Sequence, residues 1–395
     1  MSLSDKKNRF ETISVNYGSE VSQFMEASEP IYMNSGFVYQ SAEEAEAAFK
    51  GDIKRHVYAR FHNPTSDALE RRLAALEGGE ACRVTGSGMS AIFTILLGLL
   101  NPGDHIVAAR SMFSSSFYII TEILPRFGIE YTLVDNADIN LWKAALSKPT
   151  KLVLIETPTN PTCEIFDIRT ICDLAHKQNA QVIVDNAFAS PALQKPLELG
   201  ADIIIHSATK YIDGSGRSLG GAIIGKEELF DEPLGPFIRH TGPNLSAFNA
   251  WCMLQGLETL SLRMKQHSVN ALQIAQYLVD HPKVSQVYYP GLTEHKDHDI
   301  AKKQMSDFGG MLAFEVAGGK EAAFKVMNNL KVINICNNLG DTKSLICNPF
   351  TSTHASVAED EKLKQGITPG LMRYSVGLEN VDDLLEDLKQ SLSII

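Results

Sequence analysis

Short runs of apolar residues alternate with segments of helical periodicity along most of the chain. The apolar runs predict strands at 105–109, 151–156, 181–186 and 202–206, and a further run covers 222–224. The intervening segments predict helices at 41–50, 90–100, 115–127 and 167–178, and one from Thr65 or Ser66 to Glu77. Because fully apolar strands that alternate with helices are typical of a parallel sheet covered on both faces, we expect an α/β fold with a mostly parallel central sheet.

The pattern changes near both ends of the chain. After a long helical stretch at 249–281, strands are predicted at 310–316 and 371–376 and helices at 322–329 and 381–391, which indicates a smaller C-terminal α+β domain. Residues 1–60 are aromatic-rich but have no clean period, so we expect an arm that is ordered against a neighbouring subunit. We therefore divide the chain into an arm at 1–60, a large domain at 61–250 and a C-terminal domain at 251–395.

Polar residues and glycine follow the ends of several predicted strands. In a parallel sheet, ligands bind outside the carboxyl ends of the strands, and these ends meet at one edge. The positions that fall there are Gly86, Glu156, Asn160, Asp185, Ser207 and Lys210. The sequence thus predicts a binding site at this edge.

Lys210 is the candidate nucleophile at this edge. A lysine that loses water at the end of a buried strand has a lowered pKa, and its free amine forms covalent adducts with carbonyl compounds. Ser207 and Thr209 bring two hydroxyls to the same place, which suits a phosphate. An aldehyde that also carries a phosphate describes pyridoxal 5′-phosphate (PLP). The alternative from this stretch alone is a surface lysine beside a glycine-rich turn.

Two further features favour the PLP site over a surface lysine. The glycine-rich loop at 84–90 leads into an apolar helix, whose first backbone N–H groups form an anion site, although a tight turn into a buried helix explains the loop equally well. Asp185 follows an apolar strand, and a carboxylate there can pair with a protonated pyridine nitrogen, or it can simply cap a turn. Together with Lys210, the loop and the carboxylate favour a PLP site.

Composition and charge exclude several other classes of function. The formal net charge of −11 disfavours nucleic acid or an anionic membrane as the main partner. The polar first residues hold no signal core, and the longest apolar run, Ala91 to Leu100, is too short to span a bilayer. Six scattered cysteines without a C-x-x-C pair indicate reduced thiols of a cytoplasmic protein, with no metal site.

The motifs, taken in order, resemble those of the Cys/Met-metabolism PLP enzymes. This family includes cystathionine γ-synthase, the cystathionine and methionine γ-lyases and the acylhomoserine sulfhydrylases. The matching motifs are Tyr58-x-Arg60, Gly86-Ser-Gly-Met89, Glu156-Thr-Pro-Thr-Asn160-Pro, Val184-Asp185-Asn186 and His206-Ser-Ala-Thr-Lys210-Tyr. The resemblance implies the PLP-dependent transferase fold type I, like that of aspartate aminotransferase, and a homotetramer built as a dimer of dimers.

The resemblance also implies a role for each matching residue. Lys210 would bind the cofactor covalently and then move protons, with Tyr58 as a second candidate for proton transfer. Asp185 would pair with the pyridine nitrogen, and Phe113 would stack on the ring. The phosphate would be held by Gly88, Met89, Ser207 and Thr209, and by Tyr58 and Arg60 of the neighbouring subunit. Asn160 would lie near the phenolic oxygen of the cofactor and near the substrate. Ser344 and Arg373 would bind the substrate, and Arg373 would hold the carboxylate of the substrate.

Departures from the family pattern indicate the subfamily. Phe113 stands where many members have a tyrosine, Lys343 stands where cystathionine enzymes often have an acidic residue, and 211–217 lacks the Gly-His-Ser-Asp run of the lyases. These features resemble the O-succinylhomoserine sulfhydrylases, which replace the succinyl group by sulfide to give homocysteine in methionine biosynthesis. Cystathionine γ-synthase, O-acetylhomoserine sulfhydrylase and a γ-lyase stay open as alternatives, as does, more remotely, a non-enzymatic PLP- or anion-binding protein. The sequence does not fix the acyl group or the acceptor.

Overall fold

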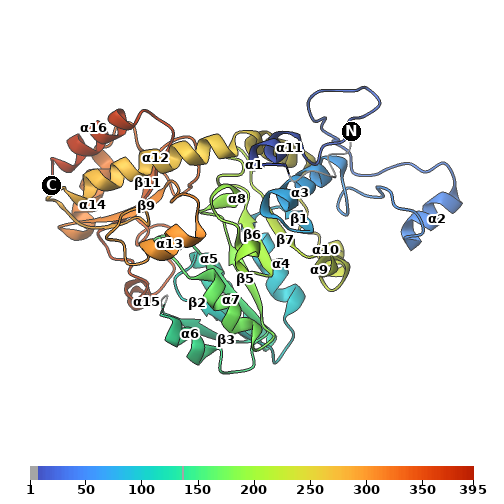
Figure 1. Cartoon of the computed structure of the whole chain (residues 1–395), viewed down its shortest axis with the longest axis horizontal. Helices are drawn as coiled ribbons and strands as arrows, with labels where there is room; N and C mark the ends of the chain where they lie inside the picture. Colours follow the sequence, from blue (N-terminus) through green and yellow to red (C-terminus); the bar gives the residue numbers. More distant parts are fainter. Residues whose placement is uncertain (1–7, 136–137) are drawn as a thin grey trace.

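The computed structural model describes residues 8–135 and 138–395, which form two sheets with helices around them (Figure 1). The larger sheet has seven strands in the order β1-β7-β6-β5-β4-β2-β3. Its strands are β1 (Ala81–Thr85), β2 (His105–Ala109), β3 (Glu130–Val134), β4 (Leu152–Glu156), β5 (Gln181–Asp185), β6 (Ile203–Ser207) and β7 (Gly221–Gly225). Strands β6, β5, β4, β2 and β3 pair in parallel, whereas β7 is antiparallel to both β1 and β6. The prediction of a mostly parallel central sheet is confirmed.

Helices cover both faces of this sheet (Figure 1). The helices in this part of the chain, not all of which lie on the sheet, are α1 (Phe10–Asn16), α2 (Ala42–Lys50), α3 (Pro64–Glu77), α4 (Gly88–Leu99), α5 (Ser114–Tyr118), the π-helix η1 (Ile119–Ile123), the 3₁₀ helices η2 (Leu124–Phe127) and η3 (Pro196–Leu199), α6 (Ile139–Ala145), α7 (Ile168–His176), α8 (Ser190–Leu193), α9 (Glu227–Asp231) and α10 (Leu234–Thr241).

Two predicted helices differ in detail. Helix α3 begins at Pro64, because the Asn63 side chain accepts a hydrogen bond from Thr65 N and caps it, so the predicted cap at Thr65 or Ser66 is wrong. The single helix expected at 115–127 is also wrong. The segment begins as α5, widens into η1 and tightens into η2, where Pro125 lacks the N–H that a continuous α-helix needs.

The last third of the chain forms the smaller sheet and the helices that pack on it. The stretch expected as one helix at 249–281 is divided at Thr259 into α11 (Ala247–Glu258) and α12 (Leu260–Val279). The five strands, in the order β10-β11-β12-β9-β8, are β8 (Val284–Tyr288), β9 (Met311–Val316), β10 (Asn334–Ile335), β11 (Leu345–Cys347) and β12 (Leu371–Ser375). The remaining helices are α13 (His298–Gln304), α14 (Gly319–Asn329), α15 (Glu359–Lys364) and α16 (Val381–Leu392).

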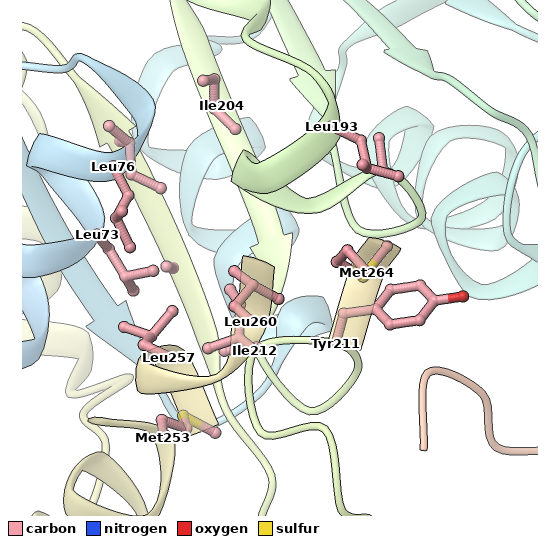
Figure 2. Close-up of a cluster of buried hydrophobic side chains, with 14 of the residues drawn as sticks. Leu73, Leu76, Leu193, Ile204, Tyr211, Ile212, Met253, Leu257, Leu260 and Met264 are labelled. Carbon is pink, nitrogen blue, oxygen red and sulfur yellow. The ribbon is translucent and has the colours of Figure 1, made fainter. Parts of the chain in front are cut away.

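A buried cluster of apolar side chains lies between the larger sheet and helices α3, α11 and α12 (Figure 2). Tyr211 and Ile212 belong to this cluster and are each 1% exposed. Because both residues directly follow Lys210, the core fixes the backbone from which the lysine side chain extends.

Only part of the segment before α3 packs on the rest of the chain. Helix α1 packs against α3, and Glu29 and Tyr32 bond to Arg72 and Thr65 of that helix, whereas α2 lies away from the two sheets (Figure 1). Several of its apolar side chains are strongly exposed, including Phe24, Met25, Met33 and Val38. The boundaries expected at residues 60 and 250 stay predictions. Within 8–135 and 138–395, no helix combines the length and the apolar character needed to cross a bilayer.

Candidate active site

A cavity of about 620 Å³ lies at the carboxyl ends of β4, β5 and β6, where the smaller sheet meets the larger one. The expected edge of the sheet supplies one side of it, and β12 and the loop at 337–339 supply another. The expected site residues that line this cavity are Gly88, Met89, Phe113, Asn160, Asp185, Ser207, Thr209, Lys210 and Arg373. Residues that are far apart in the sequence are therefore brought together in one cavity, whereas Gly86, which was also expected at this edge, is outside its lining.

Lys210 extends into the cavity from the turn that follows β6. Burial and, to a smaller extent, the nearby positive charge of Arg373 lower the pKa of its amine to about 8, although Cys336 acts in the opposite direction. The Lys210 Nζ donates a hydrogen bond of 2.6 Å to Asn338 Oδ1. About a tenth of this amine is therefore unprotonated at pH 7, far more than for an exposed lysine, and the unprotonated amine is the nucleophile.

Asp185 and Glu156 place two carboxyl groups in the same cavity. Burial raises the pKa of each carboxyl, and for Glu156 the negative charge of Asp185 raises it further. The Asp185 Oδ1 accepts from Ala187 N at 3.1 Å, which lowers its pKa in part. A positively charged group of a ligand in the cavity would stabilise the ionised form of such a buried carboxyl group.

The N-terminus of α4 points toward the same cavity. Ser87 caps the helix by accepting a hydrogen bond from Ser90 N, while Gly88 and Met89 line the cavity. A Cβ atom at Gly88 would lie 2.8 Å from Ser207 Cβ, so only glycine allows this close contact between the helix and β6. Backbone N–H groups at a helix start beside a serine hydroxyl form an anion site.

Glu156 connects two walls of the cavity. Its Oε2 accepts from Phe113 N at 2.9 Å, and its Oε1 accepts from Asn160 N at 2.6 Å. The loop that carries the Phe113 ring and the loop that carries the Asn160 amide are thereby held to the end of β4. Since its side chain fixes both loops, Glu156 determines the shape of the cavity.

Arg373 lies on β12 and is 2% exposed. Its Nη1 donates to Asn160 Oδ1 at 3.1 Å, and its Nη2 donates to the main-chain oxygens of Asn337 at 2.8 Å and Asn338 at 3.2 Å. Its Nε is buried and has no hydrogen-bond partner in the structure. An unpartnered N–H of a buried guanidinium is costly, which makes this Nε a candidate donor to an anionic group of a ligand.

Three expected site residues do not line this cavity. Tyr58 and Arg60 line a separate hollow of about 450 Å³, where the Arg60 guanidinium donates to the main-chain oxygen of Arg239. Ser344 is fully buried, and its hydroxyl bonds Glu379 Oε2 at 2.9 Å and Gly377 N at 2.9 Å. In this structure the hydroxyl of Ser344 is therefore bonded within the protein, and its expected contact with substrate stays a prediction.

Lys343, which helped to indicate the subfamily, is likewise outside the cavity lining. Its side chain is largely exposed, and its Nζ lies 3.1 Å from Asp341 Oδ1. A direct contact between Lys343 and an acceptor substrate therefore has no support in this arrangement.

Two residues of the site had been given no role from the sequence, although Glu156 was expected at this edge of the sheet. Glu156 stood at a predicted strand end, and its acidic character within an apolar strand was the available signal. Asn338 carried no such signal, because it lies in a loop of the C-terminal part that approaches Lys210 only in the folded chain.

The residues of the cavity fit PLP. The amine of Lys210 suits its aldehyde carbon, the start of α4 with Ser207 and Thr209 suits its phosphate, and the buried Asp185 suits its pyridine nitrogen. The unpartnered Arg373 Nε then remains for the carboxylate of an amino-acid substrate.

Comparison with known proteins also leads to PLP-dependent enzymes. The chain is 46% identical over 388 residues to an O-succinylhomoserine sulfhydrylase of Mycobacterium tuberculosis, which covers 97% of this chain and 95% of the relative. It is 42% identical to an L-methionine gamma-lyase of Fusobacterium nucleatum subsp. polymorphum, with 100% of both chains covered. The crystal structure of cystathionine gamma synthase from Xanthomonas oryzae pv. oryzae in complex with aminoacrylate and cysteine superimposes with a TM-score of 0.93 at 36% identity, covering 98% of each chain.

The likeness to that structure confirms the expected fold type I. The family described as Cys/Met metabolism PLP-dependent enzyme matches residues 11–393, which is nearly the whole chain. The chain therefore belongs to the Cys/Met metabolism PLP-dependent enzymes, the family that its motifs indicate.

Proposed function

We propose that this enzyme replaces the succinyl group of O-succinyl-L-homoserine by sulfide and so forms L-homocysteine. The observation that carries the proposal is the presence, in one cavity, of a lysine amine with a pKa of about 8 and a guanidinium whose buried Nε has no partner. This pair suits an amino-acid substrate that must be held by its carboxylate while a base acts on its carbon atoms. The choice of succinyl ester and sulfide is supported by the similarity to the Mycobacterium tuberculosis relative.

The cofactor-binding residues follow from their places in the cavity. Lys210 would bind the cofactor covalently through Nζ, Asp185 would pair with the pyridine nitrogen, and Phe113 would lie against the ring. Gly88, Met89, Ser207 and Thr209 would hold the phosphate at the start of α4. When bound, PLP supplies an electron sink for negative charge that develops on the substrate carbons.

The chain's own residues then position the substrate and move protons. Arg373 binds the α-carboxylate through its free Nε, and Asn160 fixes the guanidinium through Nη1. The unprotonated Nζ of Lys210 would take a proton from the α-carbon and then one from the β-carbon, so that succinate leaves from the γ-carbon with the bonding electron pair. Hydrosulfide then adds at the γ-carbon, and a proton returns to the β-carbon and to the α-carbon, which gives homocysteine. The phenyl ring of Phe113 has no exchangeable proton, so proton transfer is assigned to Lys210 and to Tyr58 of a neighbouring subunit.

The arm contributes to the active site of a neighbouring subunit in this proposal. Tyr58 and Arg60 lie outside their own chain's cavity, and the exposed Phe24, Met33 and Val38 need an apolar partner. We propose an arm at 1–60 that reaches a second copy, and an assembly of four chains as a dimer of dimers. The six cysteines are all free thiols, which supports a reducing compartment such as the cytoplasm.

A γ-lyase is the second candidate, because the Fusobacterium nucleatum relative is a methionine γ-lyase. A single panel of assays separates the candidates. O-succinylhomoserine, O-acetylhomoserine and methionine are each supplied with sulfide, with cysteine or without an acceptor, and the products are identified by mass spectrometry. We expect the highest kcat/KM for O-succinylhomoserine with sulfide. Cystathionine as the main product with cysteine would assign a synthase, and a 2-oxo acid without acceptor would assign a lyase.

A further inference from the structure

We propose that Asn338 is a positioning residue that holds the amine of Lys210 in the cavity whenever this amine is not bound to the cofactor. The Asn338 Oδ1 accepts a hydrogen bond of 2.6 Å from Lys210 Nζ. The inference rests on the proposed function only in that Lys210 must act as a free amine during turnover.

The loop that carries Asn338 is fixed on several sides. Arg373 donates to the main-chain oxygens of Asn337 and Asn338, and Asn338 N lies 3.4 Å from Cys336 Sγ. Gly340 has a φ of +73°, and a Cβ atom there would lie 2.8 Å from Tyr211 N. The loop therefore packs directly against the backbone at Lys210, so the acceptor oxygen is held in place before the lysine amine becomes free.

This contact also links the lysine to the residue that would bind substrate. Arg373 holds the main chain of Asn338, while the side chain of Asn338 holds Lys210. A shift of the guanidinium on binding a carboxylate is thus transmitted to the position of the amine. We infer that Asn338 aligns the lysine with the substrate, which is the geometric requirement for proton transfer.

The charged groups around Lys210 define how the contact affects its titration. Arg373 lowers the pKa of the amine and Cys336 raises it, while Asp185 and Glu156 line the same cavity. The amide oxygen of Asn338 stabilises the ammonium form, because only that form donates a hydrogen bond with a full positive charge. Removal of the oxygen should lower the pKa, and a carboxylate at the same position should raise it.

The test uses the full-length protein after removal of the cofactor. Trace acetylation with acetic anhydride across pH 6–10, followed by quantification of the Lys210 peptide, gives the pKa of this amine. We expect Asn338→Ala to lower it from about 8 to about 7, a tenfold change in the ratio of free amine to ammonium, and Asn338→Asp to raise it. Asn337→Ala is the matched control, because its side chain lines the same cavity but makes no hydrogen bond to Lys210 in the structure.

A second measurement uses the cofactor-loaded enzymes. Asn338→Ala should lower kcat about tenfold with little change in KM and should move the acidic limb of the kcat profile to lower pH. Equal pKa values for Lys210 in the wild type and Asn338→Ala, or an unchanged value in Asn338→Asp, would overturn the inference. Because the titration needs no substrate, its outcome is independent of whether the enzyme is a sulfhydrylase or a lyase.

Discussion

Glu156 and Asp185 occupy paired positions on the neighbouring parallel strands β4 and β5, and both side chains line the candidate active site. Two acidic groups thus share a buried space, and burial together with their mutual repulsion disfavours ionisation of both. A protonated pyridine nitrogen of a bound cofactor beside Asp185 would offset this cost. The arrangement therefore lowers the stability of the empty protein in favour of cofactor binding.

This relationship predicts that replacement of Asp185 makes the cofactor-free protein more stable. The pKa of Asp185 is raised in the folded chain, so the folded state binds more protons than the unfolded state, and its contribution to stability falls as the pH rises from about 4 through the folded pKa. We expect cofactor-free Asp185→Asn to be about 1–3 kcal/mol more stable than wild type at pH 8, with a smaller difference at pH 5. Thermal unfolding at both pH values measures this.

We expect the bound cofactor to reverse the order of stability of wild type and Asp185→Asn. With PLP present, wild type should gain more stability than Asp185→Asn, because only the carboxylate pairs with the pyridine nitrogen. If the variant were less stable than wild type at pH 8 without cofactor, the proposed cost of burying this carboxylate would be refuted.

Arg373→Lys tests the predicted binding of the substrate carboxylate. The lysine keeps the positive charge but loses the planar arrangement of N–H donors, including the Nε that now has no partner. We expect kcat/KM to fall about 10²-fold while the cofactor stays bound. Arg83→Lys is the control, because Arg83 pairs with Glu70 outside the cavity, and it should retain activity. Wild-type kcat/KM in Arg373→Lys would remove Arg373 from substrate binding.

The sequence predicted the part of the site that follows from the parallel sheet. Asp185, Ser207 and Lys210 lie at or just beyond strand ends, and the carboxyl ends of parallel strands necessarily meet at one edge. It did not predict the contact between Asn338 and Lys210, because that contact depends on how the smaller sheet packs on the larger one. The hydrogen bonds of Ser344 were not predicted for a related reason, since only the fold brings Glu379 and Gly377 to its hydroxyl.

The sequence also predicted some elements of the fold and missed others. Strands that are apolar throughout, such as β4 and β5, were recognised from composition alone, as was the helix start after the glycine-rich loop. The direction of β7 was not, because an apolar run has the same pattern whether its partner is parallel or antiparallel. The edge strand β3 was missed, since its burial is only partial.

A mixing experiment tests whether the arm reaches a second subunit. Lys210→Ala and Arg60→Ala chains are combined in equal amounts, dissociated and re-formed as dimers. If Arg60 acts in the partner's site, each mixed dimer has one intact site and one site with both changes. Half of the dimers should be mixed, so about a quarter of the wild-type activity should return from two nearly inactive parents. Proven subunit exchange without regained activity would place Arg60 outside the partner's site.

The identity of the lysine that binds the cofactor tests the account most directly. The PLP-loaded enzyme is reduced with borohydride and digested, and the peptide that carries the cofactor mass is sequenced by mass spectrometry, with Lys210→Ala treated in parallel. We predict that the cofactor is attached to the peptide at Lys210 in the wild type, and that no peptide of the variant carries it. Attachment to a different lysine, or equal labelling of the variant, would contradict the proposed active site.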